Sequence, residues 1–182
     1  MKKLYFRHGA MGSAKSLNAI TVAHNYDIRG KSVRLYIAFA GKRDDTSKEK
    51  WHIESRMGIK MSCDPIFWDT DWDLEENNFS RFDCIIVDEC QFLSRKAVDR
   101  LRFITIAYNV PVICYGLRTN WQSDLFEGSK RLMEVADSIE EVKTICYNCH
   151  RKAIMNKKIV PKGDLIDLPK DLYVPACYSC WE

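Results

Sequence analysis

The strongest constraint on the fold is a run of small residues near the N-terminus, Gly9–Ser16, which reads Gly-Ala-Met-Gly-Ser-Ala-Lys-Ser. An apolar stretch at Lys3–Arg7 precedes it and predicts a buried strand. Apolar residues at helical spacing over Ser16–Arg29 follow it, and Gly30 is a suitable residue to end that helix. The run matches the pattern G-x-x-x-x-G-K-[ST] except at Ala14, which replaces the second glycine. Between a strand and a helix, this pattern predicts a loop that binds phosphate.

Phosphate binding by such a loop has a direct physical basis. Small residues allow backbone N–H groups to point inward at phosphate oxygens, and the helix N-terminus adds a partial positive charge. We expect Lys15 to reach the β- and γ-phosphates and the Ser16 hydroxyl to bind Mg²⁺. If Ala14 needs a positive φ, its side chain costs about 1 kcal/mol, whereas a negative φ would make it harmless. The alternative is a Gly-Ser-rich turn with an exposed lysine.

A second anchor is an apolar run that ends in two acidic residues. The run Cys84–Val87 has the continuous apolar character of a buried parallel strand, and Asp88 and Glu89 follow it. In a phosphate-loop fold, Asp88 would hold Mg²⁺ and Glu89 could act as a general base, with Gln91 and Phe92 beside the acceptor. Taken alone, the run could equally end in a solvated acidic turn. The expected ATP-binding residues are Gly9, Ala10, Met11, Gly12, Ser13, Ala14, Lys15, Ser16, Asp88 and Gln91.

The rest of the first three quarters of the chain alternates between apolar runs and helical periodicity. Such alternation predicts a parallel α/β sheet. Ser94 is a suitable N-cap for the second long helix. Further strands are expected at Ser32–Ala40, Pro65–Trp68 and Val110–Tyr115, helices at Leu74–Phe79, Ser94–Tyr108 and Lys130–Ala136, and a loop at Gly41–Arg56.

Two Cys-x-x-Cys pairs, Cys146/Cys149 and Cys177/Cys180, dominate the last forty or so residues. Four thiolates satisfy tetrahedral Zn²⁺ with no open position, which marks a structural site rather than a catalytic one. The spacing between the pairs is longer than in compact zinc ribbons, so it predicts a loop that extends from the zinc site. The other four cysteines lie in or beside apolar runs and are expected to be simply buried. We therefore predict two domains, residues 1–144 and residues 145–182.

The composition and net charge of this 182-residue chain limit its expected partners and cellular location. Its net charge of +3 is small, and we find no run of five like charges, so neither a nucleic acid nor a membrane surface is an expected partner. No apolar run is long enough to cross a membrane. Arg7 and His8 interrupt the apolar N-terminus, which therefore does not resemble a signal peptide. We expect a cytoplasmic protein with reduced cysteines.

Taken together, these features resemble the zinc-containing (type II) thymidine kinases, and the resemblance covers nearly the whole chain. It rests on the loop with methionine at its third position, on the acidic strand end, on the four cysteines and on three further stretches. The matching segments are Gly9–Ser16, Ser55-Arg56-Met57-Gly58, Asp88-Glu89-Cys90-Gln91-Phe92, Tyr115-Gly116-Leu117-Arg118-Thr119-Asn120-Trp121, Leu125–Ser129 and the two cysteine pairs.

The resemblance implies an α/β phosphate-loop (RecA-like) parallel sheet flanked by helices, with a small C-terminal zinc-ribbon and lasso module. It implies transfer of the γ-phosphoryl group of ATP to the 5′-hydroxyl of thymidine, giving dTMP and ADP. Glu89 would be the catalytic base, and Lys15 and Mg²⁺ would carry the charge of the transferring phosphoryl group. Deoxyuridine is expected as a second substrate, because one methyl group is worth about 1–3 kcal/mol.

The resemblance also implies an aromatic pocket beneath the lasso that holds the thymine base. Each of its residues has an alternative role in core packing, and for Leu117 and Phe126 the two roles are evenly balanced. A homotetramer and feedback inhibition by dTTP are implied in the same way. The expected substrate-binding residues are Met11, Phe92, Leu117, Trp121, Phe126 and Tyr173.

Three departures from the family pattern concern activity rather than fold. Ala14 replaces a glycine, Thr46 stands where an arginine is expected after Asp44, and the lasso segment Asp167–Tyr173 lacks glycine. A first alternative is therefore a catalytically impaired homologue that still binds nucleotide. Another phosphate-loop ATPase, of the helicase type, is a second alternative, although two motor domains do not fit in a chain of this length. A zinc-ribbon module that binds nucleic acid is a third, against which the weak charge argues.

Overall fold

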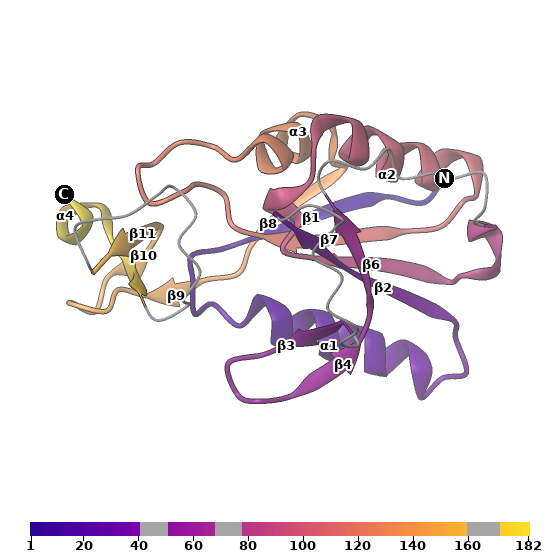
Figure 1. Cartoon of the computed structure of the whole chain (residues 1–182), viewed down its shortest axis with the longest axis horizontal. Coiled ribbons are helices and arrows are strands. Elements are labelled where there is room, and N and C mark those ends of the chain that lie inside the picture. The colour runs from indigo at the N-terminus through magenta and orange to yellow at the C-terminus, as the bar shows by residue number, and fades with distance from the viewer. Residues whose placement is uncertain (41–50, 68–77, 160–171) are drawn as a thin grey trace.

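The computed structural model describes residues 1–40, 51–67, 78–159 and 172–182. At its centre lies a parallel six-stranded sheet with the order β5-β2-β6-β7-β1-β8 (Figure 1). This sheet confirms the predicted α/β class. Its strands are β1 (Leu4–His8), β2 (Val33–Phe39), β5 (Asp64–Phe67), β6 (Cys84–Asp88), β7 (Val112–Gly116) and β8 (Ser138–Glu141).

Helices cover both faces of the sheet (Figure 1). Helices α2 (Arg95–Ala107) and α3 (Glu127–Val135) pack on one face, and α1 (Lys15–Asp27) packs on the other. Because side chains alternate along a strand, Ile85 and Val87 of β6 lie in the cluster with α2, whereas Cys84 and Ile86 lie in the cluster with α1. The continuous apolar run of β6 is therefore explained by burial on both faces.

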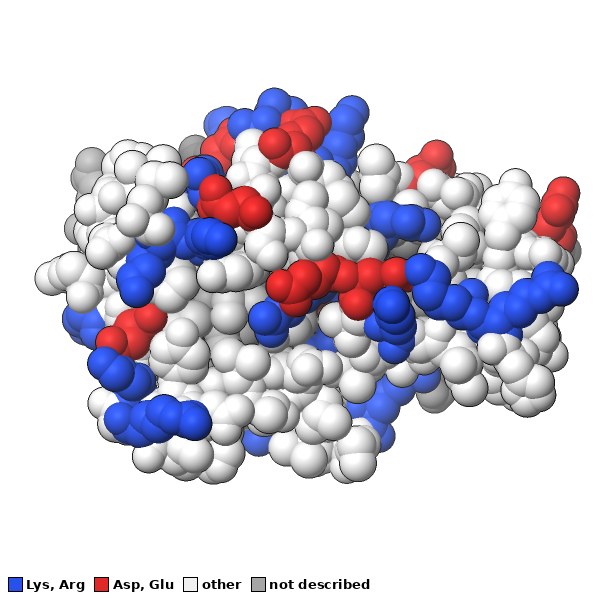
Figure 2. Space-filling view, turned by 180° about the vertical axis from the view of Figure 1, so that it is seen from behind, with Lys and Arg blue, Asp and Glu red and all other residues white. Residues whose placement is uncertain are grey.

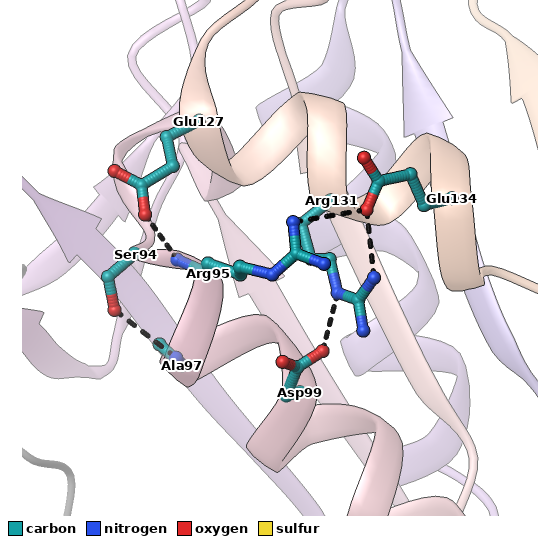
Figure 3. Close-up of polar contacts among 7 residues, drawn as sticks. All are labelled: Ser94, Arg95, Ala97, Asp99, Glu127, Arg131 and Glu134. Carbon is teal, nitrogen blue, oxygen red and sulfur yellow. Dashed lines mark hydrogen bonds and ion pairs between the residues drawn. The ribbon is translucent and has the colours of Figure 1, made fainter.

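Local sequence features set the ends of the helices. The Ser94 hydroxyl oxygen accepts a hydrogen bond from the Ala97 N–H at 3.2 Å, which confirms Ser94 as the N-cap of α2 (Figure 3). Gly30 follows α1 with φ +67°, a conformation that glycine adopts without cost. The Arg95 N–H also donates to Glu127 at 2.7 Å, which joins the start of α2 to the start of α3.

An ion-pair network continues this contact along the two helices (Figure 3). Arg131 of α3 lies 2.6 Å from Asp99 and 2.8 Å from Glu134, and Arg95 lies 3.4 Å from Glu134. Arg131 is 22% exposed and its network partners are 36–56% exposed, so solvent and salt weaken their attraction. The network therefore contributes more to the choice of the helix faces that meet than to the stability of the α2–α3 contact.

The C-terminal residues form a separate group of short elements, here called the C-terminal module (described residues 144–159 and 172–182). Strand β9 (Thr144–Ile145) pairs with β10 (Lys152–Ala153), and β11 (Met155–Lys158) pairs with β12 (Tyr173–Ala176), both antiparallel. Helix α4 (Tyr178–Trp181) follows. The buried cluster of the module consists of Cys146, Ala176 and Cys177, which is very small. The division at residues 144 and 145 stays a prediction.

Several local predictions need correction. Residues 52–54 form β3 (His52–Glu54), which pairs with β4 (Lys60–Ser62), so the predicted loop at Gly41–Arg56 is wrong for that part, and residues 41–50 lie outside the described structure. A three-residue strand is too short to show periodicity. Of the helix predicted at Leu74–Phe79, residues 74–77 are not described, and η1, a 3-10 helix, spans Phe79–Arg81. Strand β8 was not predicted, and α3 begins earlier than expected.

No helix among the described residues is both long enough and apolar enough to cross a membrane. On the face seen in Figure 2, acidic side chains form a short central stretch with basic side chains on either side of it. This face therefore presents charges of both signs.

Replacing Ser94 with alanine tests the capping assignment. Ser94→Ala leaves the Ala97 N–H without its side-chain acceptor and should lower the free energy of unfolding by about 1 kcal/mol. Arg131→Met removes exposed ion pairs instead and should cost less, with a loss that shrinks as salt is added. Urea unfolding at low and high salt measures both. If both variants lost the same free energy of unfolding and both losses depended on salt, the assignment of Ser94 as N-cap would be wrong.

Candidate functional site

The phosphate loop connects β1 to α1, and close packing at its first glycine fixes its path. A methyl group at Gly9 would lie 2.3 Å from the carbonyl oxygen of Val142 and 2.6 Å from the Ser13 hydroxyl oxygen. Gly12 has φ +74°, a conformation that strains other residues. The loop thus favours glycine at both positions; the sequence pattern predicted the first, whereas Gly12 stands at a position where the pattern allows any residue.

Ala14, the position that departs from the pattern, has φ +62° and ψ +27° and directly precedes α1. An alanine in this left-handed conformation costs roughly 1–2 kcal/mol. The structure therefore resolves the question that the sequence left open: the loop keeps its left-handed turn, and Ala14 bears the strain of it.

Lys15 folds back into the loop. Its ammonium group donates to the carbonyl oxygens of Gly9 and Ala10, each at 2.9 Å, and to the Ser13 hydroxyl at 3.3 Å. Burial lowers the pKa of Lys15, and the negative charges of Glu89 and Asp88 act in the opposite direction. A buried cation surrounded by carbonyl oxygens, with two acidic groups near it, is poised to exchange these oxygens for those of a phosphate.

The acidic strand end lies against the loop. Asp88 is only 2% exposed, and the Ser16 hydroxyl is hydrogen-bonded to its carboxylate. Burial raises the pKa of Asp88, and the neighbouring Glu89 charge raises it further. Hard oxygen ligands of this kind are those that Mg²⁺ prefers. Ser16 and Asp88 therefore fit the magnesium site that the sequence predicted.

Glu89 occupies a left-handed conformation with φ +53°, which turns the chain sharply at the end of β6. Its carboxylate accepts a hydrogen bond from the Gln91 side-chain amide at 2.6 Å. The carbonyl oxygen of that amide accepts from the Leu117 N–H at 3.0 Å. A methyl group at Gly116 would lie 2.6 Å from both Gln91 Oε1 and Cys90 Sγ, so this glycine is required for the contact. Gln91 thus fixes the Glu89 carboxylate against the end of β7.

A cavity of about 310 Å³ opens between these groups. The phosphate loop forms one side of it, Glu89 and Leu117 form another, and the turn of the β3–β4 hairpin closes a third. Sequence reasoning did not assign the hairpin residues a role, because only the tertiary fold brings them here. The lining residues are Met11, Gly12, Ser13, Ala14, Lys15, Ser16, Leu17, Glu54, Ser55, Arg56, Met57, Glu89 and Leu117.

The structure divides the predicted substrate-binding residues into three places. Met11 and Leu117 line the cavity. The rings of Phe92 and Phe126 meet edge to face, with centroids 5.9 Å apart. Trp121 and Tyr173 lie together at a third place. Their roles in binding substrate stay predictions.

Trp121 and Tyr173 both lie near a cation, the Lys158 ammonium, that sequence reasoning missed. The Lys158 ammonium is 5.6 Å from the Trp121 ring centre and 6.0 Å from that of Tyr173. Each contact has cation–π geometry. No sequence signal marks such a contact, because the three residues come from distant parts of the chain.

The four cysteines converge on one point. Their Sγ atoms all lie within 4.8 Å of one another, with 3.7 Å between Cys149 and Cys177 and 3.8 Å between Cys149 and Cys180. Sulfurs bound tetrahedrally to zinc at about 2.3 Å lie about 3.8 Å apart. The backbone N–H of Cys177, with those of Asn148 and Cys149, lowers the pKa of the Cys146 thiol to about 6. The cluster fits a structural zinc site.

Fold and site together are those of a phosphate-loop α/β protein with a C-terminal cluster of four cysteines that could hold a metal ion. A profile of the family described as Thymidine kinase matches residues 2–181. A Thymidine kinase of Listeria monocytogenes serotype 4b is 37% identical over 188 residues, which cover 99% of this chain and 96% of the relative. A Thymidine kinase of Streptococcus agalactiae serotype Ia is 38% identical over 184 residues, covering 97% and 95%. The chain belongs to the thymidine kinase family, which confirms the resemblance to its type II members.

Relieving the strain at Ala14 should stabilise the protein. Ala14→Gly removes the side chain from a left-handed residue, so the free energy of unfolding should rise by up to about 1 kcal/mol. Ala10→Gly, in the same loop but without a positive φ, should instead lower it by about 0.4–1 kcal/mol. Thermal and urea unfolding measure both variants. A loss of stability in Ala14→Gly would show that this turn is unstrained.

Bound zinc should depend on the four clustered cysteines and on no other cysteine. We expect one zinc ion per chain by elemental mass spectrometry, and loss of it in Cys177→Ser. Cys63→Ser, which removes a partly buried thiol outside the cluster, is the matched control and should keep the metal. Undiminished zinc in Cys177→Ser would overturn the assignment.

Proposed function

We propose that this protein phosphorylates thymidine, transferring the γ-phosphoryl group of ATP to the 5′-hydroxyl to give dTMP and ADP. Its family membership supports the proposal. The observation that carries it is the cavity in which the phosphate-loop residues Lys15 and Ser16 face Glu89. A phosphate anchor and a carboxylate base that line the same cavity are what phosphoryl transfer to a hydroxyl requires.

The phosphate side of the cavity would hold ATP. Inward-pointing N–H groups of the loop and the Lys15 ammonium would bind the phosphates, and Lys15 would exchange its bonds to Gly9 and Ala10 for bonds to phosphate oxygens. Mg²⁺ held by Ser16 and Asp88 would supply further positive charge. Lys15 would then stabilise the charge that develops on the transferring group.

The acceptor side would activate the 5′-hydroxyl. Glu89 would take the proton of that hydroxyl, and Gln91 would orient its carboxylate through the 2.6 Å hydrogen bond. Gln91 is thereby assigned a positioning role in addition to the ATP contact inferred from sequence. Glu89 has a left-handed backbone directly after β6, and it lines the cavity in which the hydroxyl would lie.

The base of the nucleoside would lie between Met11, Leu117 and the aromatic residues Phe92, Phe126, Trp121 and Tyr173. Flat apolar walls suit a pyrimidine ring. Deoxyuridine is the proposed second substrate. The Lys158 ammonium beside Trp121 and Tyr173 adds a charge to this region that the sequence did not reveal.

Further parts of the proposal rest on family resemblance. Zn²⁺ would be structural and would hold the lasso in the C-terminal domain, residues 145–182, while residues 1–144 bind ATP. A cytoplasmic homotetramer inhibited by dTTP is the proposed form, and neither a nucleic acid nor a membrane is a proposed partner. The alternative is a homologue that binds nucleotide without turnover, and the strained Ala14 is the observation that favours it.

A phosphoryl-transfer assay with Mg-ATP and a panel of nucleosides tests the proposal. Product should form from thymidine and deoxyuridine and not from purine nucleosides. Glu89→Gln removes the base and should lower kcat by about 10²–10⁴-fold. Glu134→Gln makes the same chemical change on α3, in the surface ion-pair network, and should leave the rate unchanged.

Each other outcome has a distinct meaning. Thymidine binding without product in the parent protein would favour the impaired homologue. Hydrolysis of ATP stimulated by DNA without thymidine would favour a helicase-type ATPase. Full activity in Glu89→Gln would leave the kinase assignment intact and remove Glu89 from the role of base.

A further inference from the structure

A single buried amide joins three parts of the protein. Asn156 of β11 is 4% exposed. Its Oδ1 accepts a hydrogen bond from the Met11 N–H of the phosphate loop at 2.8 Å, and its Nδ2 donates to the carbonyl oxygen of Thr119 at 3.2 Å. Thr119 belongs to the acceptor-side segment, defined here as Leu117–Trp121. One side chain of the C-terminal module therefore contacts both sides of the site.

We propose that Asn156 is a positioning residue that holds the phosphate loop in place against the acceptor-side segment and couples both to the four-cysteine site. The effect of Asn156 on catalysis rests on the proposed kinase function, whereas its effect on the position of the phosphate loop does not. The Met11 N–H bonded to Asn156 points at the C-terminal module, so this bond fixes the outer side of the loop.

The chemistry of the amide explains why asparagine serves here. The Met11 N–H needs an acceptor, and the Thr119 carbonyl needs a donor. A carboxamide offers both on one planar group, whereas a carboxylate offers only acceptors and a hydroxyl is too small to reach two partners at such separation. The two partners also fix which end of the amide carries oxygen.

Other contacts bring the same three parts together but join them in pairs. The Thr144 hydroxyl donates to the Gly12 carbonyl oxygen at 3.5 Å, which ties the module to the loop. The Arg118 guanidinium donates to the carbonyl oxygen of Ile154 at 3.4 Å, and the Trp181 indole N–H donates to that of Trp121 at 2.9 Å, which tie the module to the acceptor-side segment. Asn156 differs because it contacts both segments at once.

A short path connects Asn156 to the cysteines. In the β11–β12 ladder Asn156 lies opposite Pro175, and Ile154 donates its N–H to the Ala176 carbonyl oxygen at 3.0 Å. Ala176 directly precedes Cys177, one of the four clustered cysteines. A shift of Cys177 therefore moves β12, and β12 moves the strand that carries Asn156.

Removing the amide should weaken ATP binding in a chain that still folds. Asn156→Leu keeps the volume but leaves the Met11 N–H and the Thr119 carbonyl without partners, and we expect roughly tenfold weaker Mg-ATP binding by calorimetry. Asn156→Asp keeps the acceptor for Met11 and should lose less. Lys157→Met is the matched control on the same strand: it removes the 2.6 Å bond to the Cys180 carbonyl oxygen and should leave ATP affinity unchanged.

Amide hydrogen exchange of Met11 reports the bond directly. We expect faster exchange in Asn156→Leu than in the parent protein, near-parent exchange in Asn156→Asp and parent exchange in Lys157→Met. Chelation of the module's metal should accelerate Met11 exchange in the parent protein and add little in Asn156→Leu, because the connection is already broken there. The part of the chelation experiment done on the parent chain stands even if a variant folds poorly: unchanged Met11 exchange on chelation there would itself overturn the coupling to the cysteines.

The outcomes separate this inference from the proposed function. Unchanged ATP affinity and Met11 exchange in folded Asn156→Leu, or equal changes in Lys157→Met, would overturn the positioning role. Equal acceleration by chelation with and without Asn156 would overturn the coupling to the cysteines. If no nucleoside is phosphorylated while the expected exchange and affinity changes appear, the kinase proposal fails and the positioning role stands.

Discussion

The phosphate loop of this protein is organised around the ammonium group of Lys15. Lys15 is half-buried, and the loss of water around its ammonium group is unfavourable for a cation unless oxygens replace its hydration shell. Two loop carbonyls and the Ser13 hydroxyl do so, and they can only do so because the chain between Gly9 and Ala14 is wound tightly around the lysine. Asp88 and Glu89 add negative charge from the end of β6. The parallel sheet is what brings a loop and a strand end so distant in sequence to one edge.

That close winding imposes conformations that most residues avoid. Ala14 and Glu89 both have positive φ, and both line the cavity. Gly9 and Gly116 have no room for a side chain, because Val142 and Gln91 lie against them. Strain and close contact are therefore present where ATP and its acceptor would meet. They also occur elsewhere, because Asn109 and Ser123 have positive φ and Gly128 of α3 lies against backbone carbonyl oxygens.

The sequence predicted the parts whose signal is local. The phosphate loop, the β6 strand with its acidic end, the Ser94 cap and the cysteine pairs each need only a few neighbouring residues to be recognised. The positive φ of Ala14 could not be predicted, because alanine itself prefers a negative φ whereas the glycine that the pattern has at this position takes either sign. Strand β8 carries the short polar run Ser138–Glu141 and lies at the sheet edge, so it has no apolar pattern to detect. Lys158 and Asn156 gain their roles only from contacts with residues far away in the chain.

The C-terminal module shows why a metal site suits this position. Its buried cluster of Cys146, Ala176 and Cys177 offers too little apolar area to hold four short strands and a single-turn helix. Four metal–sulfur bonds can replace that core and at the same time fix one strand end, Cys177, directly after β12. Because β12 pairs with β11, rigidity at the cysteines reaches the buried amide of Asn156 through a regular ladder rather than through a flexible loop. A large apolar core would also make the module rigid. In that case, however, the stability of the module would not depend on a bound metal ion, and the phosphate loop would not be coupled to metal binding.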